Sequence, residues 1–70
     1  MKNRDRHDYV LGFILCADGN TAQQGDTVFN YYDQKVGVII EAPDREGWFR
    51  VDHEDGTSAI LNGERITTSR

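Results

Sequence analysis

The segment Asp52-His53-Glu54-Asp55 sets an imidazole among three carboxylates, the groups that proteins use for acid–base catalysis and for binding divalent cations. In an extended strand His53 would face inward while Asp52 and Glu54 face outward, because successive side chains alternate. The side chains therefore diverge, and a divalent cation would need more converging oxygen ligands. We expect a solvated acidic turn in which Asp55 and Gly56 set a hairpin, with no metal, no cofactor and no enzymatic activity.

Cys16 is the single cysteine, and together with His7 it suggests a thiol nucleophile beside a base. However, His7 lies in a charged segment, and Cys16 stands between Leu15 and Ala17, so we expect a buried, inert thiol. A lone cysteine cannot form an internal disulfide, which is typical of a reducing compartment. No apolar run approaches the roughly 20 residues of a membrane span, so the expected location is the cytoplasm.

Aromatic side chains are the best candidates for a binding surface. Tyr31 and Tyr32 adjoin a loop, where one of the two must face away from the core, and Trp48 would point outward from its strand. Rings give a large contact area at little entropic cost and attract cations to their faces. The alternative is that Trp48 is covered by the amino-terminal strand or by a second subunit. The expected contact surface for a protein or peptide consists of Trp48, Tyr31, Tyr32, Ile39 and Asp33.

Two β-rich segments, 36–42 and 48–53, would form the central antiparallel hairpin, joined by the polar loop 43–47. In the second segment apolar and charged residues alternate. In the first segment we assign even-numbered positions, beginning at Val36, to the buried side. Further strands are expected at 26–32, 58–61 and 65–68, with a polar connection at 21–25 and a 3₁₀ turn at 62–64. The predicted core contains Val28, Val38, Ile40, Phe49 and Val51.

Residues 9–17 form the most apolar run in the chain, after a charged segment, 1–8, that we expect to be a flexible tail. A helix from Asp8 to Gly19 is possible, but Gly12 would weaken it by about 1 kcal/mol relative to alanine. We favour a strand. Such a strand is apolar on both faces and a small barrel covers only one, so we expect a homo-oligomer formed through residues 9–16.

The charge distribution bears on the class of partner. Of the formal net charge of −4, the segment 1–8 contributes +1, which leaves −5 for residues 9–70. Sequence-independent affinity for nucleic acid comes from lysine and arginine replacing counterions on phosphates. An acidic body therefore disfavours a nucleic-acid partner.

The order Gly25-Asp26-Thr27-Val28, 35–39, 48–51 and the turn at Asp55-Gly56 resembles the SH3-like small barrels, including the KOW and Tudor types. The resemblance implies an all-β fold, a five-stranded SH3-like barrel with an extra amino-terminal strand, occupying residues 9–70 as one domain. It implies an interaction module for a protein or peptide. Two alternatives remain: a KOW-like nucleic-acid binder, and a small oligomeric enzyme built like the type II dihydrofolate reductases, whose active segment has no counterpart at 58–61.

Overall fold

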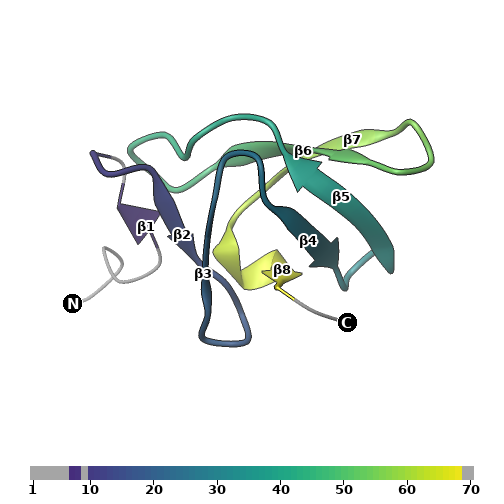
Figure 1. The fold of residues 1–70 in the computed structure, drawn as a ribbon, viewed down its shortest axis with the longest axis horizontal. Helices are drawn as coiled ribbons and strands as arrows, with labels where there is room; N and C mark the ends of the chain where they lie inside the picture. Colours follow the sequence, from purple (N-terminus) through teal and green to yellow (C-terminus); the bar gives the residue numbers. More distant parts are fainter. Residues whose placement is uncertain (1–6, 9, 69–70) are drawn as a thin grey trace.

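The structure is a computed structural model that describes residues 7–8 and 10–68 of the 70-residue chain. Its regular elements are almost entirely strands, so the all-β prediction is confirmed (Figure 1). In chain order they are β1 (His7–Asp8), β2 (Phe13–Leu15), β3 (Thr21–Gln23), β4 (Thr27–Asn30), β5 (Lys35–Ile39), β6 (Phe49–His53), β7 (Ser58–Leu61), the 3₁₀ turn η2 (Gly63–Arg65) and β8 (Ile66–Thr67).

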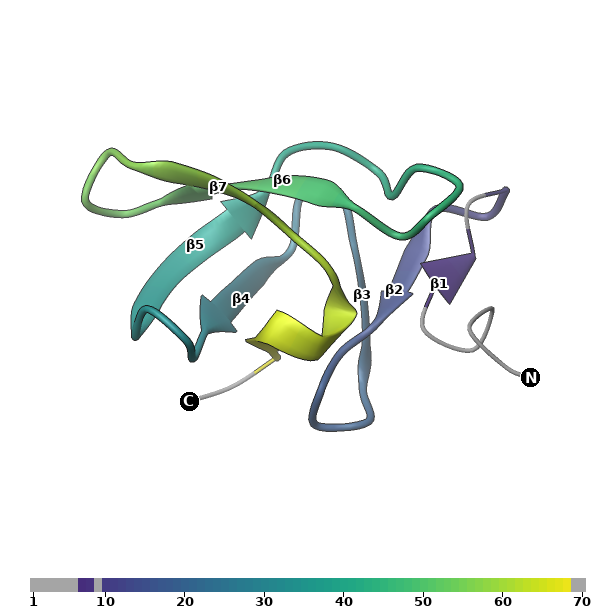
Figure 2. The ribbon, with the colours of Figure 1, turned by 180° about the vertical axis from the view of Figure 1, so that it is seen from behind.

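Five strands form a curled antiparallel sheet in the order β7-β6-β5-β4-β8, which makes a half-barrel. The smaller sheet, in the order β1-β2-β3, lies beside it and helps to close the core (Figure 2). Strands β4 to β7 follow one another as hairpins, while β8 returns across the sheet to pair with β4. Among the described residues, no helix is long and apolar enough to cross a membrane.

Strand β6 has the alternation that the sequence predicts. Phe49, Val51 and His53 are buried, whereas Arg50 and Asp52 are exposed. The hairpin turn predicted at Asp55 and Gly56 is present, and a 3₁₀ turn lies close to the predicted position. Strands are also present at 58–61 and 66–67. The buried apolar side chains form one cluster: Ile14, Cys16, Ala22, Val28, Ile39, Phe49, Val51, Leu61 and Ile66.

The buried face predicted for β5 is wrong. Ile39 is fully buried, and Val38 is 39% exposed; Ile40, also assigned to the core, is only partly buried. Both faces of this strand are apolar, so alternation alone could not choose between them. Packing against β6 determines which face of β5 is buried. A Cβ on Gly37 would lie 2.6 Å from Cγ1 of Val51, so only glycine fits on the inner face at this position.

The amino-terminal prediction needs two corrections. The run 9–17 is not one strand, because a turn at residues 10–12, with Gly12 at φ +84°, separates β1 from β2. The predicted tail, 1–8, includes β1, whose His7 and Asp8 pair with β2; its residues 1–6 lie outside the described residues. In addition, β3 occupies part of the segment predicted to be a polar connection, and it buries Ala22 against the core.

The carboxyl-terminal elements pack tightly on β2 and close one edge of the large sheet. A Cβ on Gly63 would lie 2.1 Å from the carbonyl oxygen of Leu15, so η2 contacts that backbone directly. On the outer side of β8, the Ala17 N–H donates to the Ile66 carbonyl at 2.8 Å. The carboxylate of Asp18 accepts hydrogen bonds from the N–H and hydroxyl of Thr68, which hold its pKa down at about 2. This edge of the sheet is therefore covered by the β2–β3 turn.

Candidate interaction surfaces

Tyr31 and Tyr32 lie together on the β4–β5 turn. Their ring centroids are 5.1 Å apart in an edge-to-face arrangement, and the Tyr31 hydroxyl donates to the carbonyl of Glu64. The guanidinium carbon of Arg65 lies 4.2 Å from the centroid of the Tyr32 ring. One face of Tyr32 is therefore already in contact with a cation of the same chain, and the pair fastens this turn to η2.

Asp33, predicted to be a charge partner for a ligand, also shapes this turn. Its carboxylate accepts a hydrogen bond from Nδ2 of Asn30 at 3.2 Å, and its N–H donates to Oδ1 of Asn30 at 3.3 Å. The next residue, Gln34, has φ +57°, the left-handed conformation that residues other than glycine rarely adopt. The reciprocal Asn30–Asp33 contact holds the backbone as it enters this conformation.

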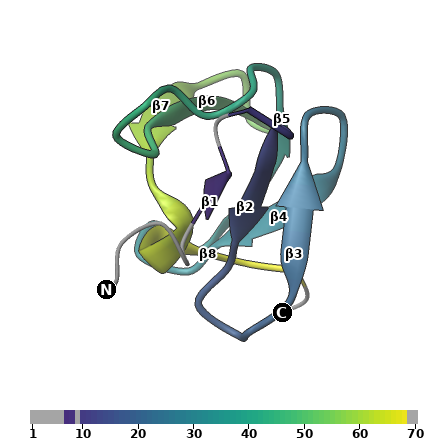
Figure 3. The same cartoon turned by 90° about the vertical axis from the view of Figure 1, so that its left-hand side faces the viewer.

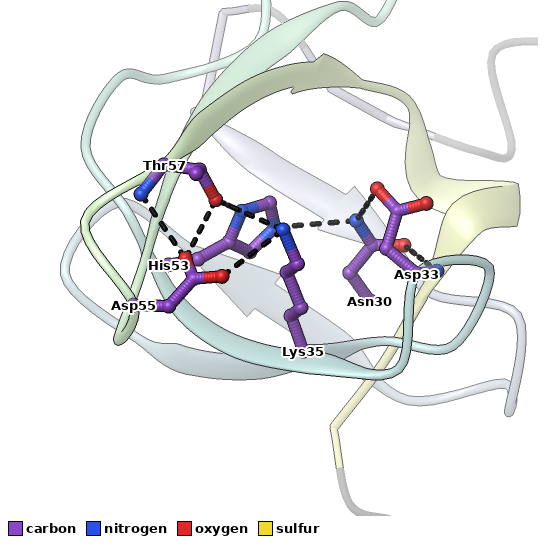
Figure 4. A network of polar contacts seen from close by, with 6 residues as sticks. All are labelled: Asn30, Asp33, Lys35, His53, Asp55 and Thr57. Carbon is purple, nitrogen blue, oxygen red and sulfur yellow. Dashed lines mark hydrogen bonds and ion pairs between the residues drawn. The ribbon is translucent and has the colours of Figure 1, made fainter.

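A polar network joins the β4–β5 turn to the β6–β7 turn (Figure 4). Asn30 is fully buried and His53 is 6% exposed. Because Oδ1 of Asn30 accepts from the Asp33 N–H, the amide nitrogen faces His53 and donates to its Nε2 at 3.2 Å. Nε2 is then the acceptor, so Nδ1 of His53 carries the proton and donates to Oγ1 of Thr57 at 3.1 Å. These partners define which ring nitrogen of His53 faces Asn30 and which faces Thr57.

Thr57 is the centre of the network. Its hydroxyl accepts from Nζ of Lys35 at 3.2 Å as well as from His53, and it donates to Oδ1 of Asp55 at 2.6 Å. Lys35 also forms an ion pair with Asp55 at 3.1 Å. The Thr57 hydroxyl, the Thr57 N–H and Lys35 together lower the pKa of Asp55. The hydrogen-bonding capacity of His53 is thus used within the fold.

The acidic segment at 52–55 leads into the hairpin turn that the sequence predicts. His53 faces inward, Asp52 and Glu54 are exposed, and Gly56 has φ +91° in the hairpin loop. Among the described residues, no three His, Cys, Asp or Glu side chains lie close enough together to hold a metal ion. Cys16 is 1% exposed, in agreement with the packing role predicted for it.

Trp48 lies at the other end of the sheet from the tyrosines. The register pairs Asn30 with Lys35 and Gly37 with His53, so the tyrosine turn adjoins the end of β6, whereas Trp48 precedes its start. Trp48 and His53 are five residue steps apart along this segment, about 17 Å at 3.3 Å per residue. The structure brings Tyr31, Tyr32 and Asp33 together but not Trp48. Ile39 is in the core, so the prediction that its side chain lines the surface is wrong.

The loop between β5 and β6, which ends at Trp48, lies at the same end of the molecule as the β1–β2 turn (Figure 3). The backbone N–H of Trp48 donates to Oδ1 of Asp44 at 3.0 Å, and the Asp44 N–H donates to the Trp48 carbonyl, which fixes the loop before β6. A Cβ on Gly12 would lie 3.9 Å from Cβ of Ala42 in the same loop. Val10, Leu11 and Trp48 are 82%, 72% and 40% exposed. We call these three side chains the apolar end.

Two surface hollows lined by described residues are open and polar. One of about 270 Å³ lies beside the network and is lined by Gln34, Lys35, Val36, Glu54 and Asp55. Another of the same volume is lined by Phe13, Thr21, Ala22, Gln23 and Asp26. Pockets for small molecules are usually enclosed and mostly apolar. Neither of these two hollows has these properties.

A comparison of the chain with protein-family models, with curated proteins and with solved structures finds no match in any of the three. The site is therefore argued from its own residues. Sequence reasoning did not place Val10 and Leu11 in a turn near the loop before β6, because it assigned them to the middle of a strand. Gly12 was the available signal, since glycine in an apolar strand pattern often marks a turn or bulge.

Proposed function

We propose that this chain is a protein-interaction module of the small SH3-like barrel type, and that it acts by binding rather than by catalysis. The observation that supports this function most directly is the apolar end. Large apolar side chains exposed together on a small soluble domain are a common mark of a protein contact surface. Here they belong to a turn and a loop that are anchored on the core, so the surface is presented in a defined shape.

Trp48 would be the anchor of the contact. Tryptophan is enriched among the residues that dominate binding energy, and removing such a side chain typically costs at least about 2 kcal/mol, roughly a 30-fold loss of affinity. Val10 and Leu11 would surround it and exclude water. The tyrosine pair supports a contact surface less well, because Arg65 and Glu64 already use Tyr32 and Tyr31.

The test compares affinity capture from native lysate by the wild-type chain, by Trp48→Ala and by Tyr32→Ala. Tyr32 is also an exposed aromatic residue, but it lies at the opposite end, so its variant is the matched control. We expect Trp48→Ala to lose the captured partner and Tyr32→Ala to keep it, with both variants folded by circular dichroism. If only Tyr32→Ala lost the captured partner, the binding site would lie at the tyrosine turn. If Trp48→Ala unfolded, Trp48 would belong to the core.

A further inference from the structure

Strand β7 ends the five-stranded sheet, and within residues 7–8 and 10–68 no strand pairs with the backbone groups on its outer edge. The His53 N–H donates to the Thr57 carbonyl at 2.7 Å, so these two residues form a hydrogen-bonded pair. Along an antiparallel ladder such pairs alternate with pairs whose backbone groups point outward. Ala59 therefore bonds to β6, whereas the N–H and C=O groups of Ser58 and Ile60 point away from β6.

The two edges of this sheet differ. The outer side of β8 is covered, since Ala17 bonds to Ile66 and Asp18 bonds to Thr68. Residues 57–62, which include β7, contain no charged residue and no proline. Charged side chains and prolines are the features that usually prevent an edge strand from pairing with another chain. Ile60 on this edge is 55% exposed. Figure 2 shows the β6–β7 hairpin extending from the body of the molecule.

We propose that β7 pairs with β7 of a second copy of this chain, antiparallel about a two-fold axis at Ala59. The two half-barrels then share one continuous sheet. This contact is made by backbone groups of Ser58 and Ile60 and not by the side chains of the apolar end, so the proposal does not depend on the function proposed above.

Backbone geometry selects this register. With the axis at Ala59, Ser58 of each copy faces Ile60 of the other, and every outward N–H and C=O group of these residues finds a partner. An axis at Ser58 would set Ile60 against Gly56 of the hairpin loop. An axis at Ile60 would set Ser58 against Asn62, which caps η2. Only the register at Ala59 keeps the hydrogen-bonded pairs of both Ser58 and Ile60 within β7.

Charge complementarity supports the same arrangement. Within one chain Asp52 pairs with Ser58 and Arg50 pairs with Ile60. Four residues therefore lie side by side across the joint sheet, one from each of four neighbouring strands. This row starts with Asp52 and Ser58 of one copy and continues with Ile60 and Arg50 of the second. Each row ends in opposite charges, whereas an axis at Ile60 would align Arg50 with its own symmetry mate. The opposite charges lie three strand spacings apart, about 14 Å, so they favour the Ala59 register over the Ile60 register mainly at low ionic strength.

A disulfide trap tests the register. In the proposed pairing Ala59 faces its symmetry mate across a pair without hydrogen bonds, with Cα atoms about 4.5 Å apart, within the range for a disulfide. Ser58 and its mate are diagonal neighbours about 7–8 Å apart, outside the preferred range. Under diamide oxidation we expect Ala59→Cys to form at least about tenfold more covalent dimer than Ser58→Cys. The wild-type chain, whose Cys16 is buried, is the background control.

Sedimentation equilibrium gives an independent measurement. The average mass of the wild type should rise from 8.0 kDa toward twice that value as the concentration approaches about 1 mM. Ile60→Lys, which adds a charge to the edge, should remain a monomer. Equal crosslinking of the two cysteine variants, or a wild type that remains a monomer, would overturn the proposal. Dissociation by Trp48→Ala but not by Ile60→Lys would also overturn it, since the copies would then meet at the apolar end.

Discussion

Replacing Thr57 with valine removes one hydroxyl group while keeping the size and branching of the side chain. That hydroxyl accepts from Nδ1 of His53 and Nζ of Lys35 and donates to Asp55. Valine can do neither. His53 is only 6% exposed, so the N–H at its ring Nδ1 would become a buried donor that has lost this acceptor.

The expected loss of stability follows from that buried donor. An unsatisfied buried polar group costs about 1–3 kcal/mol, and because Thr57 itself is exposed and water can partly replace it, we expect about 1–2 kcal/mol. For a domain of this size each kcal/mol lowers the melting temperature by about 4–8 °C. The lost hydroxyl is also the largest cause of the lowered pKa of Asp55, so that pKa should rise toward its ordinary value of 3.8.

The assay combines urea unfolding at pH 7 with an NMR titration of Asp55, and Thr57→Ser is the control that keeps the hydroxyl. Valine should lower the free energy of unfolding and raise the pKa of Asp55, whereas serine should retain most of both properties. If valine changed the free energy of unfolding by less than about 0.5 kcal/mol and left the Asp55 titration unchanged, the hydroxyl-centred network would be wrong.

Three other variants test separate features. Gly63→Ala should destabilise the domain by about 3 kcal/mol, because the new Cβ meets the Leu15 carbonyl, and an unchanged melting temperature would contradict that contact. Gln34→Gly should raise the free energy of unfolding by about 0.5–1 kcal/mol by relieving a left-handed residue, while Gln34→Ala should not; urea midpoints check both. The lowered pKa of Asp18 stabilises the fold above pH 3.8, and this stabilisation is lost as the pH falls through about 2. Thermal unfolding of Asp18→Asn should therefore depend less on pH between 5 and 2, and an equal dependence would refute this linkage.

The sequence predicted strands well where one face was apolar and the other charged. In β6 Phe49 and Val51 alternate with Arg50 and Asp52, so a shift of one residue would have buried charges. Strand β5 lacked that signal, and its orientation was set by the contact between Gly37 and Val51. Strand β3 was missed because its three residues include only one apolar side chain, and pairing with β2 determines its conformation.

The site could be predicted only in part, because neighbours in sequence and neighbours in space differ here. Tyr31, Tyr32 and Asp33 are consecutive and remain together. The position of Trp48 relative to them depends on the register of three strands, which composition does not encode. Asn30 was also missed, although an inward strand position that contacts His53 requires a polar partner.

The bonds between the β2–β3 turn and β8 have a consequence for the order of folding. Strands β4 to β7 connect neighbours in sequence, and hairpins of this kind form within about 1–10 µs. Thr68, by contrast, reaches back 50 positions to Asp18, so this closure carries a larger entropic cost. We expect the meander to form early and the last strand to dock late, which would make this seam the first to open when the native state fluctuates.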